Sequence, residues 1–382
     1  MASFIPLSVP NFQGNEKEYV NEAVVSEWVS TGGSKVGDFE NAIAHYVGMP
    51  RAVACNSGTS GLHLAAMVAG LGKGDEVLVP TLTFIAAVNP TTRYVGAEPV
   101  FIGCDDSLCM DPAAAERFCA ERCELQGERL IDKATGAHVK AIVVVHVFGN
   151  MADMPAFLAL AEKYHLILIE DATEALGTHY TEGPLKGKFA GTIGDVGVYS
   201  FNGNKIITTG AGGMVVSNHP DWAEHAKHLS TQAKADELQF LHDEVGYNYR
   251  MTNLQAALGL AQIEELEGFI AHKHAMWQMY KDALDGTKYV VTFKDQSSVW
   301  TRGDTLLAEN QYGRVYEDTD KDGALSLPAG SYTFTMQTQT GGMTDSFTVS
   351  GQSTVSVTFD TKNWLLTDGY QLSSRTKTSF GD

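Results

Sequence analysis

Short apolar runs alternate with amphipathic stretches along the first 285 residues, and this rhythm restricts the possible folds more than any other feature of the chain. The runs "RAVAC", "DEVLVP", "KAIVVV" and "LILIED" are almost continuously apolar, which is typical of strands buried on both faces of a parallel sheet. Between them, segments such as "TSGLHLAAMVAGLG" and "MPAFLALAEKYH" predict helices. The pattern therefore predicts an α/β fold, a three-layer sandwich in which helices cover both faces of a mostly parallel sheet.

The composition changes near residue 286 and divides the chain into two parts. All 12 histidines and all five cysteines precede this point, whereas residues 287–382 contain 28 serine or threonine residues among 96 positions. Segments such as "SYTFTMQT" and "STVSVTFD" alternate polar and apolar residues with a period of two, and turn signals such as "PAG" and "TGG" separate them. We therefore predict two domains, residues 1–286 and residues 287–382, the second a small antiparallel β sandwich.

The charge and the hydropathy of the chain exclude several classes of protein. With 27 Lys+Arg against 46 Asp+Glu the formal net charge is −19, which disfavours a general affinity for nucleic acid or for an anionic membrane. No apolar run is long enough to cross a bilayer, and the first residues lack the basic and then apolar layout of a secretory signal. We expect a cytoplasmic protein that binds neither nucleic acid nor membrane.

The five cysteines indicate reduced thiols rather than disulfides, because they are odd in number and confined to the first third of the chain. Cys119 and Cys123 lie four residues apart, so on a helix they would share a face and could hold a metal with Cys104 and Cys109. The spacings lack the tight CxxC form of common zinc sites. Buried thiols are therefore the favoured interpretation, and no metal site is predicted.

Ligands of open parallel sheets bind at the carboxyl ends of the strands, and three segments there carry candidate residues. In "CNSGTSG", Gly58 lies in the turn and Thr59 at a helix start, where free N–H groups favour a phosphate, although a plain N-cap would look similar. The strand "LILIED" ends on Glu170 and Asp171, which are either solvated loop acids or a partner for a cationic ring nitrogen. Lys205 follows the strand "VGVYSF" and precedes a glycine cluster that permits close approach; a surface lysine is the alternative.

The combination of the three segments predicts one cofactor. No acidic residue lies inside "SFNGNKIITTGAGG", so Lys205 would be desolvated among neutral amides and hydroxyls. Desolvation of this kind favours the free amine, which can form a Schiff base. A phosphate cradle and an aspartate for a pyridine nitrogen complete what pyridoxal 5′-phosphate (PLP) requires of a protein. The sequence therefore predicts a PLP enzyme.

The ordered motifs resemble those of the fold type I, PLP-dependent aminotransferases that act on nucleotide-linked keto sugars. They are "NSGTSGLHLA", "GDEVLVPTLTFIAAVNP", "VHVFGNMADM", "IEDATEALG", "SFNGNKIITTGAGGM" and "GYNYRMTNLQAALGLAQ". The resemblance covers roughly residues 1–285 and implies a mixed, mostly parallel sheet and a homodimer with shared active sites. "DDSLCMDP" and "TLTFIAAVNP" are similar to the branch that makes 4-amino-6-deoxy sugars for legionaminic-acid pathways, which implies UDP as the carrier.

The resemblance also implies roles for single residues. Lys205 would form the Schiff base and move protons during the reaction, and Asp171 would partner the pyridine nitrogen. The residues implied to hold the phosphate are Gly58, Thr59 and Ser200, together with Asn248 from a second subunit.

Four further residues receive weaker assignments from the same resemblance. Phe84 would stack on the ring face, with an ordinary core aromatic as the alternative. Asn202 would bind the cofactor, and Arg250 would meet a substrate anion. Glu174 would face the phenolic oxygen of PLP, where many family members have glutamine; a carboxylate changes that hydrogen bond unless it is protonated or turned away. The dehydratases of the family carry histidine in place of the lysine, so Lys205 argues against dehydration.

The tail departs from the family, whose small domain packs beside the cofactor cleft. Here "VYEDTDKDGALSLPAGSYTFTM" loosely resembles a hairpin of prealbumin-like or Cna-B-like sandwiches. Its "DTDKDG" opens like a calcium loop, but Ala329 stands where an EF-hand needs a bidentate glutamate, so an Asp/Gly turn is favoured. A natural fusion, an assembly artefact or a frame error upstream of the tail would each explain it.

Two functions follow from this sequence. In the first, L-glutamate supplies an amino group through PLP to the C4 keto carbon of a UDP-linked 4-keto-6-deoxy sugar used for surface glycans. In the second, loss of the small domain leaves a PLP-binding chimera without turnover, and the β-rich tail makes it a binding or structural module.

Overall fold

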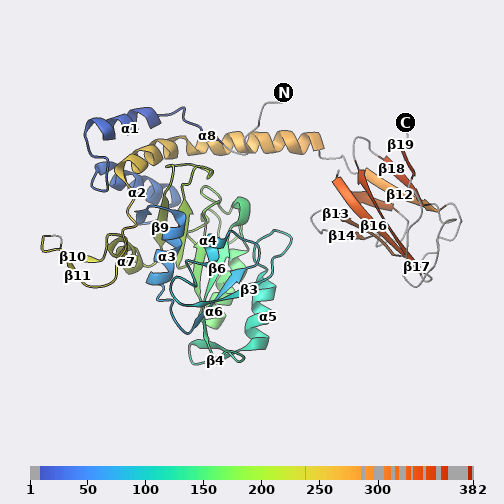
Figure 1. Cartoon of the computed structure of the whole chain (residues 1–382), viewed down its shortest axis with the longest axis horizontal. Helices are drawn as coiled ribbons and strands as arrows, with labels where there is room; N and C mark the ends of the chain where they lie inside the picture. Colours follow the sequence, from blue (N-terminus) through green and yellow to red (C-terminus); the bar gives the residue numbers. More distant parts are fainter. Residues whose placement is uncertain are drawn as a thin grey trace. The chain divides into compact units, whose positions relative to one another are not determined.

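The structure is a computed structural model, and it describes residues 9–236 and 238–284 together with eight strands between residues 289 and 380. It divides into two compact units, Met1–Ala271 and His272–Asp382 (Figure 1). The described helices are α1 (Glu16–Val25), α2 (Ser34–Val47), α3 (Gly58–Val68), α4 (Ile85–Val88), α5 (Pro112–Arg122), η1 (Val147–Gly149), α6 (Met154–Tyr164), α7 (Pro220–Ser230) and α8 (Asn253–Leu284).

The strands of the first unit are β1 (Ala52–Cys55), β2 (Asp75–Pro80), β3 (Glu98–Ile102), β4 (Cys123–Gln126), β5 (Arg129–Asp132), β6 (His138–Val145), β7 (Ile167–Asp171), β8 (Val196–Ser200), β9 (Gly213–Ser217), β10 (Lys234–Asp236) and β11 (Leu241–His242). Nine of them form one sheet with the order β1-β9-β8-β7-β6-β2-β3, and β4 and β5 extend it beside β6. The pairs from β3 through β2, β6 and β7 to β8 are parallel, whereas β9 is antiparallel to both of its neighbours. The predicted mostly parallel, mixed sheet is confirmed.

Helices cover both faces of this sheet, as predicted. Side chains of successive strand residues point to opposite faces, so alternate residues of β6 enter different cores. Val143 and its like-facing neighbours pack with α3, α4 and α7, whereas Ile142 and Val144 pack with α5 and α6. A third core joins α2 and α8 to the second face near β1 and β9. The three-layer sandwich is therefore present in the first unit.

The structure revises the sequence prediction at the cysteines. Cys119 lies in α5, but Cys123 begins β4, because Arg122 is the last helical residue; the pair does not share a helical face. All five cysteines are free, and burial raises the pKa of Cys119 to about 12 and that of Cys123 to about 11. A buried thiol with a raised pKa is a poor source of the thiolate that binds metal. The favoured interpretation as buried thiols holds for four of them, while Cys104 is partly exposed.

The second unit contains the end of α8, and the rest of it is described as strands. They are β12 (Tyr289–Asp295), β13 (Thr305–Asn310), β14 (Val315–Glu317), β15 (Ala324–Leu327), β16 (Gly330–Thr338), β17 (Gly341–Val349), β18 (Thr354–Phe359) and β19 (Lys377–Phe380). They form two four-stranded sheets, β15-β12-β18-β19 and β14-β13-β16-β17. The predicted antiparallel pairing is wrong for β12 and β18, which pair parallel, and holds for the other described pairs. That these sheets make a sandwich domain stays a prediction, and the "DTDKDG" turn lies outside the described residues.

Among the helices that the structure describes, none combines the length and the apolar character that crossing a bilayer requires.

Candidate active site

The carboxyl ends of β7 and β8 meet the amino end of α3, and predicted residues from all three elements come together there. Asp171 ends β7, Ser200 ends β8 and Gly58 begins α3. A Cβ atom added to Gly58 would lie 2.8 Å from Cβ of Ser200 and 3.2 Å from Cγ2 of Thr173, which is closer than real Cβ contacts allow. Gly58 is therefore required because the helix starts directly against the strand end.

The first turn of α3 offers an anion site. Ser57, which the sequence analysis passed over, is the N-cap residue, and its Oγ accepts a hydrogen bond of 3.0 Å from the N–H of Ser60. By the geometry of an α-helix, the N–H groups of Gly58 and Thr59 have no partner within the helix. Gly213 lies against the same turn, because a Cβ atom there would be 2.5 Å from the carbonyl oxygen of Ser57. These features suit a bound phosphate.

Asp171 is nearly fully buried, so the structure excludes the interpretation as a solvated loop acid. Burial raises the pKa of its carboxyl, while hydrogen bonds from Thr173 and the charge of Lys205 oppose that shift. The N–H of Thr173 donates to Oδ1 of Asp171 at 3.1 Å. A buried carboxylate of this kind gains most from a cationic N–H donor at its free side, which is what a protonated pyridine nitrogen supplies.

Lys205 is partly buried, with 17% of its side chain exposed, but its surroundings are not neutral as predicted. Its Nζ donates a hydrogen bond of 3.0 Å to Oε1 of Glu174. Oε2 of the same carboxylate accepts the N–H of Phe148 at 3.1 Å, and Phe148 has a left-handed φ of 55°. The expectation failed because it considered only the residues next to Lys205 in the sequence, whereas the acid lies 31 positions earlier. In this structure Glu174 is turned toward the lysine.

Glu170 is a residue whose role the sequence did not reveal. Its side chain is fully buried, and Oε2 accepts hydrogen bonds from Nε2 of His146 at 2.9 Å and from the N–H of Gly191 at 2.8 Å. Oε1 accepts the N–H groups of Ile193 at 2.6 Å and Gly194 at 2.5 Å. This carboxylate therefore fixes the loop between β7 and β8 behind Asp171.

We expect the substitution Glu170→Ala to lower the free energy of unfolding by about 3–5 kcal/mol, because it leaves several buried donors without an acceptor. Urea denaturation followed by circular dichroism measures the change. Glu182→Ala, at an exposed loop position, is the control and should stay within about 0.5 kcal/mol of the parent. A Glu170→Ala variant as stable as the control would contradict this role.

Gly58→Ala should weaken PLP binding, because the added methyl group pushes the first turn of α3 away from Ser200 and opens the anion site. Overpacking of this kind also costs about 1–3 kcal/mol of stability. Absorbance titration with PLP and thermal unfolding measure the two effects. Gly37→Ala in α2 is the matched control, because a Cβ atom there meets nothing within 4 Å; it should leave binding unchanged and stabilise slightly.

Phe84 and Asn202 lie in exposed positions. Phe84, the residue before α4, is 79% exposed, so its interpretation as an ordinary core aromatic is wrong. Asn202 is exposed as well; its Nδ2 donates to Oδ1 of Asn204 at 3.2 Å, and its carbonyl oxygen accepts the N–H of Lys205 at 3.0 Å. The assignments of both side chains to the cofactor stay predictions.

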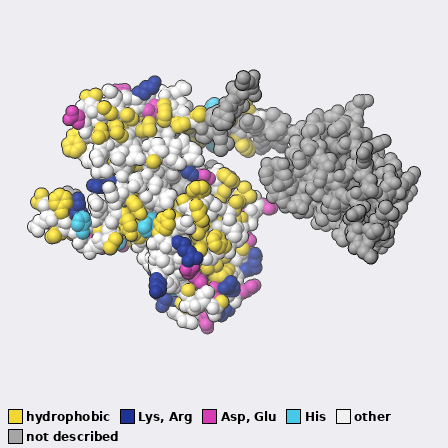
Figure 2. Space-filling view, viewed as in Figure 1, with side chains coloured by type: hydrophobic (Ala, Val, Ile, Leu, Met, Phe, Trp, Pro, Cys, Tyr) yellow, Lys and Arg dark blue, Asp and Glu magenta, His cyan; other side chains and the backbone are white. Residues whose placement is uncertain are grey.

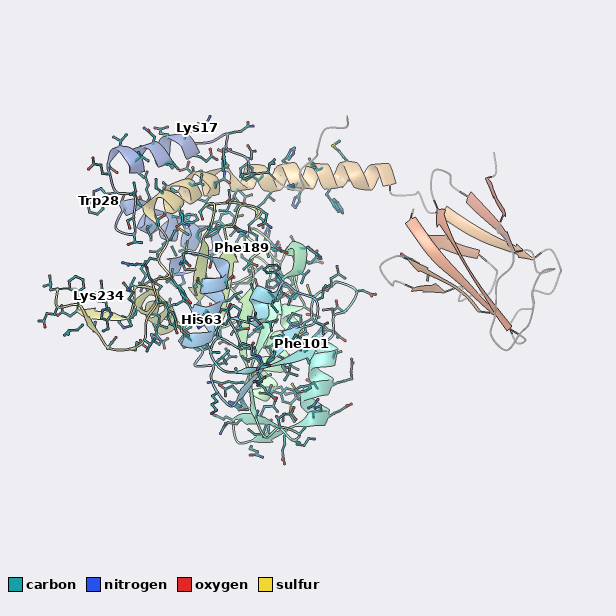
Figure 3. All side chains as sticks on the ribbon, in the orientation of Figure 1. Lys17, Trp28, His63, Phe101, Phe189 and Lys234 are labelled. Atoms are coloured by element: carbon teal, nitrogen blue, oxygen red, sulfur yellow. The ribbon has the colours of Figure 1, made fainter. Side chains whose placement is uncertain are left out.

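The segment that carries Asn248 is held against α3 by its two tyrosines. His63 lies on α3 (Figure 3). Tyr249 bonds to its Nδ1 at 3.0 Å, and Tyr247 packs edge-on against the same ring. Because side chains alternate along an extended segment, Asn248 between them points outward and is exposed. Its Oδ1 accepts the Nε hydrogen of Arg250 at 3.1 Å, so the two predicted residues contact each other.

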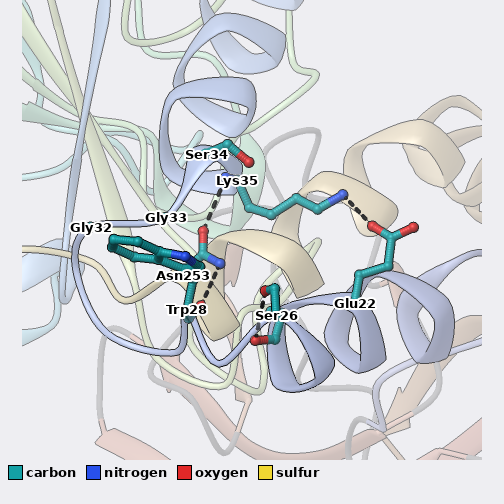
Figure 4. Close-up of a pocket in the computed structure, with 9 residues that line it drawn as sticks. Glu22, Ser26, Trp28, Gly32, Gly33, Ser34, Lys35 and Asn253 are labelled. Carbon is teal, nitrogen blue, oxygen red and sulfur yellow. Dashed lines mark hydrogen bonds and ion pairs between the residues drawn. The ribbon is translucent and has the colours of Figure 1, made fainter.

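A pocket of about 410 Å³ lies away from these residues, between α1, α2 and the start of α8 (Figure 4). Nδ2 of Asn253 donates to the carbonyl oxygen of Trp28 at 2.6 Å, and Lys35 pairs with Glu22 at 2.8 Å. None of the predicted site residues lines it. Its lining residues are Glu22, Ala23, Ser26, Trp28, Gly32, Gly33, Ser34, Lys35 and Asn253.

Comparison with known proteins supports the same class of enzyme. The model of the DegT/DnrJ/EryC1/StrS aminotransferase family matches residues 10–318, which is 32 positions beyond the predicted boundary at 286. GDP-perosamine synthase of Escherichia coli O157:H7 is 41% identical over 282 residues, 74% of this chain and 72% of that protein. EpsN of Bacillus subtilis, described as a pyridoxal phosphate-dependent aminotransferase, is 39% identical over 290 residues, 75% and 71% of the two chains.

A crystal structure of a DegT DnrJ EryC1 StrS aminotransferase from Brucella abortus shares 26% identity with a TM-score of 0.65, over 84% of this chain and 74% of that one. The fold and the cluster around Asp171 and Lys205 thus define a fold type I, PLP-dependent enzyme. The chain belongs to the DegT/DnrJ/EryC1/StrS aminotransferase family. Within it, the chain is a PLP-dependent sugar aminotransferase.

Proposed function

We propose that this enzyme transfers the amino group of L-glutamate to the C4 keto carbon of a nucleotide-linked 4-keto-6-deoxy sugar. The observation that carries the proposal is the contact between the strand ends and α3, which joins a buried acid, an anion site and Lys205. When bound, PLP supplies an aldehyde that accepts an amino group and a ring that stabilises negative charge. The residues present fit this group, because each of its functional parts has a partner among them.

We propose a role for each of the chain's own site residues, and their positions support these roles. The N–H groups of Gly58 and Thr59, with Ser200 beside them, hold the phosphate. Asp171 stays ionised against the ring nitrogen, because a hydrogen-bonded cation offsets the cost of its burial. Lys205 would be the nucleophile that attaches the cofactor and, as a free amine, the base that moves a proton between carbon and nitrogen. Glu174 holds the released ammonium of Lys205 in place.

The sequence resemblance and the relatives imply different nucleotides as the carrier of the sugar. The resemblance to legionaminic-acid enzymes implies UDP, whereas the name of the Escherichia coli relative contains GDP. Identity of 41% to that relative favours GDP as the carrier in this chain. We therefore propose a GDP-linked sugar, with the UDP-linked sugar as the comparison in the assay.

We further propose a homodimer in which Asn248 reaches the phosphate site of the partner and Arg250 meets an anion of the substrate. The hairpin β10–β11 beside this segment exposes Leu238 (93%) and Phe240 (68%), and Val245 after the hairpin is 78% exposed. Large apolar side chains in such numbers are typical of an interface. Sedimentation velocity should therefore find a dimer, and a monomer at assay concentrations would contradict this assembly.

For the tail, we propose that residues 287–382 form a β-rich domain in place of the family's small domain. The eight strands described between residues 289 and 380 support this. We also propose a cytoplasmic location, because the products of sugar-nucleotide enzymes are used inside the cell.

The two half-reactions test the proposed function separately. Purified enzyme with PLP should be yellow, lose the colour with L-glutamate, and regain it with the 4-keto sugar nucleotide. GDP- and UDP-linked forms of the same sugar are compared at equal concentration. Colour that never responds to glutamate would instead support the PLP-binding chimera without turnover.

A further inference from the structure

A cluster of two histidines and two carboxylates joins α7 to the segment after β11. His225 and His228 lie three residues apart on one face of α7, and Asp243 and Glu244 follow the hairpin. Nε2 of His228 lies 2.7 Å from Oδ1 of Asp243 and 3.6 Å from Oε1 of Glu244, and Nε2 of His225 lies 2.8 Å from that same oxygen. Histidine side chains reach the surface in this region (Figure 2).

The arrangement is more than a pair of surface ion pairs. An imidazole nitrogen carries at most one hydrogen. Nε2 of His228 lies near two carboxylates, so it can donate a well-directed hydrogen bond to only one of them. Two adjacent carboxylates repel each other, and a doubly charged cation in place of the proton satisfies both at once.

The distances match the coordination shell of a transition metal. Zinc binds histidine nitrogen at about 2.0–2.1 Å and carboxylate oxygen at about 2.0–2.2 Å, so neighbouring ligand atoms of a tetrahedral site lie about 3.4 Å apart. The ligand atoms of His228, Asp243 and Glu244 all lie within 4.8 Å of one another. An ion therefore enters if the separations between ligand atoms change by up to about 1.4 Å and one proton is lost.

The backbone holds these ligands in place without the metal. The N–H of Asp243 donates to the carbonyl oxygen of Ala233 at 3.3 Å, and that of Tyr247 donates to Leu229 of α7 at 2.7 Å. Side chains of His228 and Glu244 remain 26% and 41% exposed, so water can complete the shell and an ion can enter. Such a preformed set lowers the cost of ordering ligands on binding.

We propose that His228, Asp243 and Glu244 form a binding site for a divalent transition metal of the zinc type, with His225 orienting Glu244 by its hydrogen bond. An imidazole and two carboxylates without thiolate suit Zn²⁺, Co²⁺ or Ni²⁺ better than Mg²⁺ or Ca²⁺, which prefer oxygen ligands throughout. The ion links α7 to the segment that continues into Asn248 and Arg250. Its role is structural, and it takes no part in amino transfer.

Isothermal titration of the PLP-loaded full chain with Zn²⁺, after dialysis to remove excess PLP, tests the site. We expect one ion per chain, no saturable uptake in His228→Ala, and binding weakened about 10- to 100-fold in His225→Ala, as is usual for residues that orient a ligand. His219→Ala is the matched control, because His219, the N-cap residue of α7, pairs with a single carboxylate, Asp195, at 2.7 Å. It should bind zinc as the parent does.

Asp243→Asn is the second variant, since Asp243 is 56% exposed and its substitution leaves the fold intact. It should also abolish uptake, and bound Co²⁺ should show no thiolate absorption. Hydrogen exchange should slow on metal addition only in α7 and residues 241–250. Absence of uptake by the parent chain, uptake unchanged in both His228→Ala and Asp243→Asn, or protection elsewhere in the chain would each overturn the proposal.

Discussion

Lys205→Ala is expected to abolish amino transfer, with a loss of at least about 10⁴-fold in kcat, because one residue supplies both the attachment point of PLP and the proton carrier. The glutamate half-reaction should disappear, because Lys205 is the proposed proton carrier. Stopped-flow absorbance with L-glutamate measures this loss. The effect should fall on kcat rather than on the affinity for the sugar nucleotide, which other residues bind.

The control for this variant distinguishes the role of the Lys205 amine from the role of its ion pair with Glu174. Lys205→Arg keeps a cation beside Glu174, 3.0 Å away in the parent chain, but offers no amine that can attach to PLP. We expect it to be as inactive as Lys205→Ala while retaining the stability of the parent. Substantial glutamate turnover in either variant would show that Lys205 has another role.

Asp171→Asn is expected to lower kcat about 10²- to 10³-fold and at the same time to stabilise the chain without cofactor. The activity falls because a neutral amide no longer holds the ring nitrogen in its protonated state. The stability rises because burial raises the pKa of Asp171, so the folded state disfavours its ionised form. An asparagine of the same shape still accepts the N–H of Thr173 and carries no charge to bury.

The stability difference should depend on pH with a definite sign. A buried acid with a raised pKa costs nothing below its pKa in the unfolded chain; its cost grows as the pH rises from that value to the raised folded pKa and is constant above it. The Tm of Asp171→Asn should therefore exceed that of the parent at pH 7, and the two should converge toward pH 4. Differential scanning calorimetry of both chains without PLP measures it. A gap that is constant with pH would contradict the buried charge.

The large-domain fold was predictable because its signals are local. The continuous apolar run "DEVLVP" predicted a buried strand, and it forms β2 (Asp75–Pro80). The helices between such strands were predicted from the periodicity of their apolar residues. Ser200 was assigned from the family resemblance. The same locality placed Gly58 and Asp171 at a helix start and a strand end that meet in the folded chain. Rules for strand ends sufficed for these residues because parallel topology brings such ends together.

The contacts that escaped prediction join residues far apart in sequence. Glu174 reaches Lys205 across 31 positions, and Glu170 gathers donors from His146 and from a loop that follows it by more than 20 positions. Spacing patterns carry no information about such contacts, since each depends on how a loop folds over the sheet. The cluster of His228 with Asp243 and Glu244 was hidden for the same reason.

Reduction with borohydride followed by peptide mass spectrometry tests the central claim most directly. It fixes PLP to whichever amine carries it, and the tag also blocks tryptic cleavage at that lysine. The predicted result is one tagged tryptic peptide, residues 189–227, with the modification on Lys205. A tag on a different lysine, or an untagged chain after full loading with PLP, would contradict it.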